Sequence, residues 1–215
     1  SYINEIKESK LTDQSNVMES KEIEIMLKKQ KSSLCKIKTS KGVGLGFLCK
    51  IPSPVLITCN PILEQPEMES GNEIIISSID SNTEKIIKID SSRKTYTIGQ
   101  IGEFKIDTTI IEIFPEKDGL ENENFLEIDE YLIEEGDDDS KYLLKKNYES
   151  KNIYILHDKD GKNIIACTGF IAQINENGYL CDIIHNCNAN TKSYGAPIIL
   201  GNGKVIGFDI VCNAK

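Results

Sequence analysis

Short apolar runs alternate with polar and turn-forming residues over most of this chain, from about residue 32 onward. The runs are rich in Ile, Val, Thr and Phe and are interrupted by Gly, Asn, Asp and Pro, which is typical of antiparallel β-structure. The twelve predicted strands are residues 34–39, 44–51, 55–58, 73–78, 85–89, 95–98, 108–113, 152–157, 163–173, 179–186, 197–200 and 205–211. This pattern predicts an all-β fold, either a sandwich or a pair of barrels.

Two segments depart from this pattern. Residues 20–31 combine helical spacing of apolar side chains with many good helix formers, which predicts a helix within an N-terminal arm. Residues 121–150 are acidic, above all from Glu134 to Asp139, and they are the natural connection between two halves. We expect an arm of residues 1–31 and a domain of residues 32–215, with its first half at about 32–120, the connection at about 121–150 and the second half at about 151–215.

Composition narrows the function classes. The 215 residues suit one compact domain, and a net charge of −9 argues against a nucleic-acid partner, because such partners are held by clustered Lys and Arg. There is no apolar run long enough to span a bilayer and no signal-like start, so we expect neither a membrane partner nor export. The seven cysteines are scattered through predicted strands, which indicates buried thiols in a reducing, cytoplasmic setting.

Three local motifs have ordinary structural interpretations. Residues 158–161 resemble the start of a calcium loop, but the remaining ligands are missing, so a hairpin turn is expected. Residues 42–46 contain the glycines of a phosphate loop without its spacing. His157 and His185 are the only histidines, and Cys187 follows the second. Since a metal site would need a third ligand, we expect no metal and no cofactor.

Four segments, in order, resemble a trypsin-like peptidase of the chymotrypsin fold and PA clan. They are residues 43–49, 55–63, 105–113 and 185–207. The likeness extends from about residue 33 to the end, and the chain resembles intracellular trypsin-like domains of microbial eukaryotes and fungi. It implies two antiparallel six-stranded β-barrels, preceded here by the short N-terminal helix or arm. In that family the four segments carry a general-base His, an orienting Asp and a nucleophile loop of the form Gly-x-Ser-Gly-x-Pro.

The resemblance places Pro61 at the base position, Asp107 at the orienting position and Tyr194 at the nucleophile position. Proline has no group that accepts a proton, and a tyrosine phenol with a pKa of about 10 is a poor nucleophile at neutral pH. Lys192 replaces the first glycine of the nucleophile loop, which disfavours a formed oxyanion hole. These departures predict a pseudoprotease, that is, a chain that is not an enzyme.

The expected function is therefore protein binding, as a scaffold or a subunit of a larger assembly. The partner would contact the N-terminal arm, the surface loops or a peptide cleft that includes Lys192, Ser193, Tyr194 and Gly195. Two alternatives stay open. One is an atypical peptidase or hydrolase that uses Cys59 or Ser193, or is completed by a partner. The other is a non-catalytic sensor that binds extended peptides.

Overall fold

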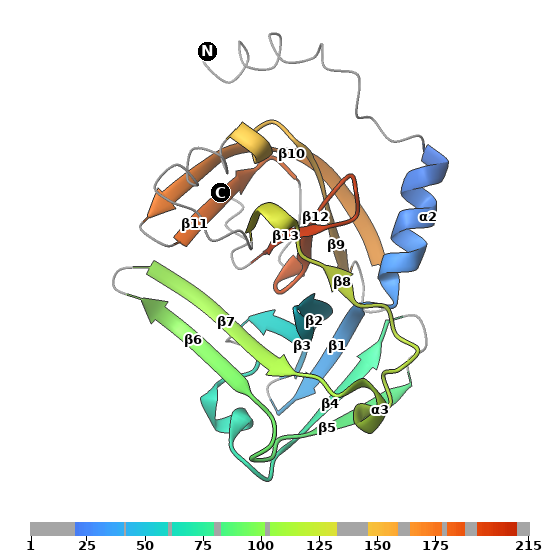
Figure 1. The fold of residues 1–215 in the computed structure, drawn as a ribbon, viewed down its shortest axis with the longest axis vertical. Helices are drawn as coiled ribbons and strands as arrows, with labels where there is room; N and C mark the ends of the chain where they lie inside the picture. Colours follow the sequence, from blue (N-terminus) through green and yellow to red (C-terminus); the bar gives the residue numbers. More distant parts are fainter. Residues whose placement is uncertain are drawn as a thin grey trace.

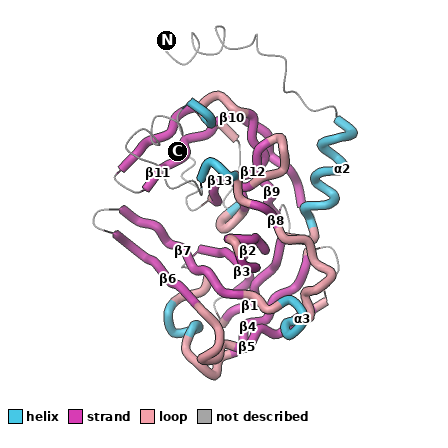
Figure 2. The backbone as a smooth tube through the Cα atoms, in the orientation of Figure 1, coloured by secondary structure: helices cyan, strands magenta, loops and turns pink. Residues whose placement is uncertain are grey.

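Two curled antiparallel sheets make up this fold, and Figure 1 draws one above the other. Strands account for most of the described backbone in Figure 2. The prediction of an all-β fold with two antiparallel barrels is confirmed, although the described strands divide as eight and five rather than six and six. The computed structural model describes residues 20–40, 42–59, 62–79, 83–101, 104–132, 146–158, 164–177, 180–187 and 193–209.

The first sheet has the strand order β5-β4-β1-β2-β3-β7-β6, and β8 pairs with β2 off this path. Every pairing on the path is antiparallel, while β8 runs parallel to β2. Its strands are β1 (Leu34–Thr39), β2 (Gly42–Ile51), β3 (Ser53–Cys59), β4 (Glu73–Ser78), β5 (Glu84–Lys88), β6 (Thr95–Ile101), β7 (Phe104–Glu112) and β8 (Leu126–Glu127).

The middle strands of this sheet are buried on both faces. In β2 and β3, five consecutive residues are buried, which matches their near-continuous apolar sequence. Alternate side chains enter different cores, because successive residues of a strand point to opposite faces. Leu48 and Leu56 belong to the core inside the first barrel, whereas Phe47 and Ile57 belong to a core shared with the second sheet. These two strands therefore hold the two barrels together.

The second sheet has the order β11-β10-β9-β12-β13. Its inner face contributes Ile155, Ile171 and Ile198 to the shared core. Strands β9 and β10 are antiparallel partners with Asp158 opposite Ile164, as the strands of a hairpin are, while the predicted turn after Asp158 lies outside the described residues. The strands are β9 (Asn152–Asp158), β10 (Ile164–Asn177), β11 (Leu180–His185), β12 (Pro197–Leu200) and β13 (Val205–Phe208).

The predicted N-terminal helix is present as α2 (Ser20–Lys31). Leu27 packs on the shared core, and the Gln30 side-chain amide donates to the carbonyl of Gly203 at 3.0 Å, so the C-terminal end of α2 is attached to the second sheet. No helix within the described residues is long and apolar enough to cross a membrane. Sequence analysis missed three single turns, namely η2 (Gln65–Met68), α3 (Pro115–Asp118) and η3 (Glu130–Leu132).

The segment between the barrels is more than a loop. Its strand β8 pairs with β2 at Cys49, and Ile128 forms a parallel bridge with Val205 of β13. The Asp129 amide donates to the Val205 carbonyl at 2.9 Å. The connection thus contacts both sheets in turn. The acidic run from Glu134 to Asp139 lies outside the described residues.

A buried ion pair closes one end of the first barrel. Arg93 donates from two nitrogens to the carboxylate of Asp118, at 2.9 and 2.7 Å, and both side chains are almost fully buried. Arg93 also donates to the carbonyls of Lys88 and Glu112, and Asp118 accepts from the Phe114 amide at 2.8 Å. Because both charges have several hydrogen bonds, this pair ties α3 to β5 and β7.

Candidate functional site

Asp107, the predicted orienting residue, lies on β7 at an irregularity in the sheet. Its φ of 47° is in the left-handed region, which Asp adopts more readily than most residues. The register of β6 against β7 shifts between Ile98 and Gln100 at the same level, so Asp107 belongs to a β-bulge. Bulges redirect side chains, and here the Asp107 side chain is buried.

Cys59 ends β3 next to this bulge, with Thr108 as its cross-strand partner. Its carbonyl accepts from the Ile62 amide at 3.0 Å. The pKa of the Cys59 thiol is raised to about 12, mainly by burial and in smaller part by the nearby carboxylates of Asp107 and Asp209. The thiol therefore lies close to one acid from each barrel.

The loop at the predicted nucleophile position forms a tight turn at Ser193–Gly195. The Ala196 amide donates to the Ser193 carbonyl at 2.7 Å, and the Gly195 amide donates to the Asp209 carbonyl at 2.8 Å. The buried Ser193 hydroxyl donates to the Asp209 carboxylate at 2.5 Å. In return, the Asp209 amide donates to the Ala196 carbonyl at 2.8 Å. Asp209 thus holds both ends of the turn.

Gly195 allows this turn to pack closely against the first barrel. It has a φ of 83°, and a Cβ atom added there would lie 2.4 Å from the Leu45 carbonyl oxygen and 3.3 Å from the Cys59 sulfur. The same carbonyl accepts the Thr58 hydroxyl at 2.7 Å. Only glycine allows this close approach together with this backbone conformation. The turn is therefore fixed in position relative to β2 and β3.

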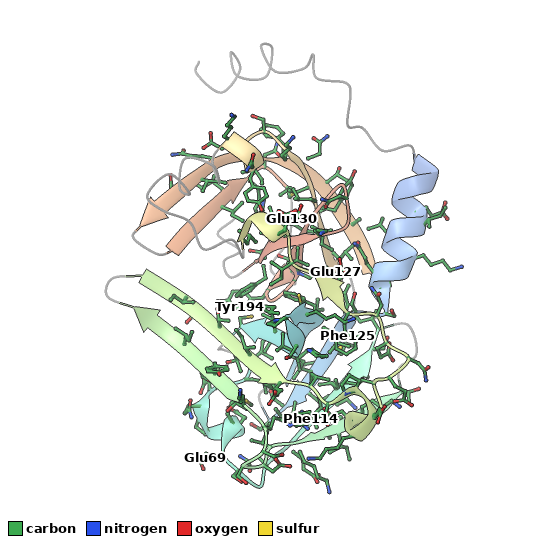
Figure 3. All side chains as sticks on the ribbon, viewed as in Figure 1. Glu69, Phe114, Phe125, Glu127, Glu130 and Tyr194 are labelled. Carbon is green, nitrogen blue, oxygen red and sulfur yellow. The ribbon has the colours of Figure 1, made fainter. Side chains whose placement is uncertain are left out.

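The fold thus brings two of the three predicted triad positions to the junction of the barrels. Tyr194 is half-buried, and Figure 3 shows it at the level where the two sheets meet. Asp107 and the turn approach each other around Cys59. The third position, Pro61, lies outside the described residues, and so does Lys192 of the predicted peptide cleft.

The two alternative nucleophiles are both poorly placed for attack. Cys59 is fully buried, and its pKa of about 12 leaves almost no thiolate at neutral pH. The Ser193 hydroxyl is also fully buried and is bound to the Asp209 carboxylate. Both residues therefore act in the structure as packing and anchoring groups of the turn.

The minor motifs have structural roles. Residues 42–46 lie in β2, where a Cβ atom on Gly46 would be 2.8 Å from the Ile57 carbonyl oxygen, so these glycines serve strand packing. His185 ends β11, and the side chain of His157 lies outside the description. Among the described residues, no three His, Cys, Asp or Glu side chains form a group that could hold a metal ion.

Two antiparallel barrels that meet at Asp107 and the Ser193–Gly195 turn define a trypsin-like fold. No family of known proteins matches the sequence, and no curated protein does so either. Among solved structures, the Rv3671c protease from M. tuberculosis in an inactive form is 14% identical, with a TM-score of 0.58 over 87% of this chain and 82% of that one. Deg5 is 14% identical, with a TM-score of 0.61 over 90% and 87%. The HtrA-type protease AlgW with tripeptide is 14% identical, with a TM-score of 0.56 over 85% of this chain and 52% of that one.

These similarities correct one prediction. From Pro61 and Tyr194 the sequence analysis predicted that the chain is not an enzyme, but the solved structures of this fold are described as proteases. This comparison contradicts the prediction of a non-enzyme. The prediction rested on the residue types at Pro61 and Tyr194, whereas the comparison rests on the arrangement of the two barrels, which two side chains do not determine.

Asp209 is the residue that sequence analysis missed. It directly follows β13 and anchors a turn sixteen positions earlier in the chain. A charged residue that ends the apolar segment 205–208 was the available signal, because a buried carboxylate needs hydrogen-bond donors. Nothing in the sequence indicated that Ser193 would be the donor.

Proposed function

We propose that this chain is a protease-class domain that takes an extended polypeptide into the junction of its barrels, against the Ser193–Gly195 turn. The observation that carries the proposal is the anchoring of this turn by Asp209. Four hydrogen bonds, three of them involving Asp209, hold residues 193–196, and Gly195 rests on the Leu45 carbonyl. Such a fixed turn binds a ligand with little loss of its own conformational entropy.

The neighbouring strand supports an extended ligand. On one side β13 pairs with β12, and on the other it is bridged to Ile128 only at Val205 among the described residues. The rest of β13 runs from this bridge to Asp209, beside the turn. An extended peptide there would continue the pairing that Ile128 begins, which is the strand-addition mode of peptide recognition.

Tyr194 is the proposed contact at the centre of this surface. It is the half-buried residue of the turn, between the buried Ser193 and Gly195. A partly buried aromatic ring on a rigid backbone is a common centre of binding energy, since it offers a large contact area with few rotatable bonds. The similar structure of AlgW is described with a tripeptide, which supports a peptide as the ligand class.

Binding is tested with fluorescein-labelled β-casein, an unfolded polypeptide, titrated with the full chain and followed by fluorescence anisotropy. We expect saturable binding that Tyr194→Ala weakens by about 30-fold, the loss typical of a central aromatic contact. Ile86→Ala is the matched control, because Ile86 is an exposed apolar residue on β5. Equal affinities of Tyr194→Ala and wild type would refute the proposal.

Peptide-bond hydrolysis is the second activity that we propose for this junction, supported by the protease descriptions of the similar structures. Because Cys59 and Ser193 are buried and engaged, we expect cleavage to need a nucleophile or base from a partner protein. A fluorophosphonate probe and iodoacetamide test this expectation on the native chain. Stoichiometric labelling of Ser193 or Cys59, faster than in the unfolded chain, would show instead that the chain holds its own nucleophile.

A further inference from the structure

Two cysteines lie close together in the second sheet. Cys187 follows β11, and its sulfur donates to the carbonyl of Cys167 on β10 at 3.9 Å. The pKa of Cys187 is raised to about 12, mainly by burial and in smaller part by the Cys167 thiol and the Asp209 carboxylate. The Cys187 sulfur therefore lies beside Cys167, and it is near enough to Asp209 to be influenced by that carboxylate.

Gly169 makes this contact possible. A Cβ atom on Gly169 would lie 2.7 Å from the Cys187 sulfur and 2.8 Å from the Cys187 nitrogen. The chain that leaves β11 therefore crosses the bare backbone of β10, where any side chain would displace it. The Asn186 side chain holds the crossing, since its oxygen accepts the Phe170 amide at 2.7 Å.

This pair differs from the other described cysteines in its exposure. Cys35, Cys49 and Cys59 are at most 1% exposed, whereas Cys167 and Cys187 are partly exposed. A thiol must be reached by an oxidant before it can react. Of the described cysteines, these two alone combine partial exposure with contact to a second thiol.

We propose that Cys167 and Cys187 form a reversible disulfide that regulates the Ser193–Gly195 turn, an inference about regulation that rests on the proposed function. The oxidant is a low-molecular-weight disulfide such as glutathione disulfide. The Cys167 thiolate attacks one glutathione sulfur, breaks its S–S bond and releases one glutathione. The Cys187 thiol then loses its proton and attacks the Cys167 sulfur, releasing the second glutathione. The two cysteines lose two electrons and two protons in total, and glutathione disulfide gains them.

The disulfide acts on the turn through chain connectivity. Cys187 lies six residues before Ser193 and close to Asp209. A covalent bond to β10 fixes the start of the segment that leads to the turn, so local opening of the turn becomes rarer. With fewer openings, the binding-competent form of the turn is populated for more of the time, so its affinity for a polypeptide rises.

The test begins with the full chain, incubated with glutathione disulfide at pH 8.5 and digested for mass spectrometry. We expect a peptide pair joined through Cys167 and Cys187, which dithiothreitol separates. Cys187→Ser should abolish the pair, while Cys35→Ser, a buried control in the first barrel, should retain it. Gly169→Ala should slow its formation at least tenfold, because the added methyl displaces the Cys187 sulfur. Absence of the Cys167–Cys187 link in the folded wild type would overturn the proposal.

Regulation is read separately by hydrogen exchange at the amides of Gly195 and Ala196. Oxidation should slow this exchange about tenfold in wild type and leave it unchanged in Cys187→Ser. Affinity for labelled β-casein should rise about threefold on oxidation. A link that forms but leaves exchange unchanged would contradict the regulatory role. If casein does not bind in either redox state while exchange slows, the proposed function fails and control of the turn stands.

Discussion

Two buried aspartates hold this molecule together in different ways. Asp118 meets a full positive charge, since two nitrogens of Arg93 donate to it in the first barrel. Asp209 meets the neutral hydroxyl of Ser193 at the junction of the barrels. The first arrangement neutralises its charge and closes a barrel end. The second holds the turn close to Cys59 and Cys187, where the Asp209 carboxylate contributes to the raised pKa values of both thiols. Asp118 therefore stabilises the first barrel, whereas Asp209 holds a turn of the candidate site.

The largest loss of stability is expected from removal of the Arg93–Asp118 ion pair. Arg93→Ala leaves Asp118 buried without its cation, and we expect a loss of about 3–5 kcal/mol in the free energy of unfolding. Urea denaturation at pH 7 measures it. Lys117→Ala is the control, because Lys117 pairs with Asp90 on the surface and such pairs contribute little. Equal midpoints for the two variants would show that Asp118 does not depend on Arg93.

The next effect concerns the close approach of the turn to β2. Gly195→Ala combines a φ of 83° with a clash against the Leu45 carbonyl, while Gly71→Ala has a φ of 101° and open space around it. We expect about 1 kcal/mol of destabilisation at Gly71 from the backbone conformation alone, and about 3 kcal/mol at Gly195. Thermal unfolding of both variants checks this difference. Similar losses would mean that the turn moves away from β2 without cost.

Removal of the Ser193 hydroxyl tests whether Asp209 holds the turn. Ser193→Ala deprives the Asp209 carboxylate of a buried donor, and we expect a loss of about 1–3 kcal/mol, together with faster hydrogen exchange at Gly195. Ser92→Ala removes the same kind of hydroxyl–carboxylate bond at the exposed Asp90, so its stability should match wild type. If Ser193→Ala also matched wild type, Asp209 would not be the anchor of the turn.

The smallest expected effect is a fall in the free energy of unfolding at alkaline pH, caused by the Cys59 thiol. The pKa of Cys59 is about 12 in the folded chain and about 8.5 when unfolded. Between these values the unfolded state holds fewer protons than the folded state, so stability falls as pH rises from about 8.5 toward 12. We expect the free energy of unfolding of Cys59→Ala to fall by about 1.6 kcal/mol less than that of wild type between pH 8.5 and 10. Parallel urea midpoints for both proteins across this range would contradict a buried protonated thiol at Cys59.

The first barrel was largely predictable, because alternation of apolar residues is a local signal. Strands β1 and β4 fall on residues 34–39 and 73–78 as predicted. The two residues of β8 are too few to show any period, and the extension of β10 to Asn177 passes through a register shift after Ile171. Such features depend on partners distant in the chain, which periodicity does not register.

The candidate site was predictable only in part. The positions of Asp107 and Tyr194 came from the order of motifs, and the fold brings both to the barrel junction. The contacts of Ser193 with Asp209 and of Cys187 with Cys167 join residues sixteen and twenty positions apart, so no local pattern indicates them. The prediction of a non-enzyme rested on the residue types at Pro61 and Tyr194, while the comparison that contradicts it rests on the fold.

Hydrogen exchange of the full chain with and without unlabelled β-casein is the most direct test of peptide recognition at the junction. We predict that casein protects the amides of residues 193–196 and 205–209, and that Tyr194→Ala removes this protection. Protection confined to α2, with no change at the turn, would contradict the account and move the binding surface to the N-terminal helix.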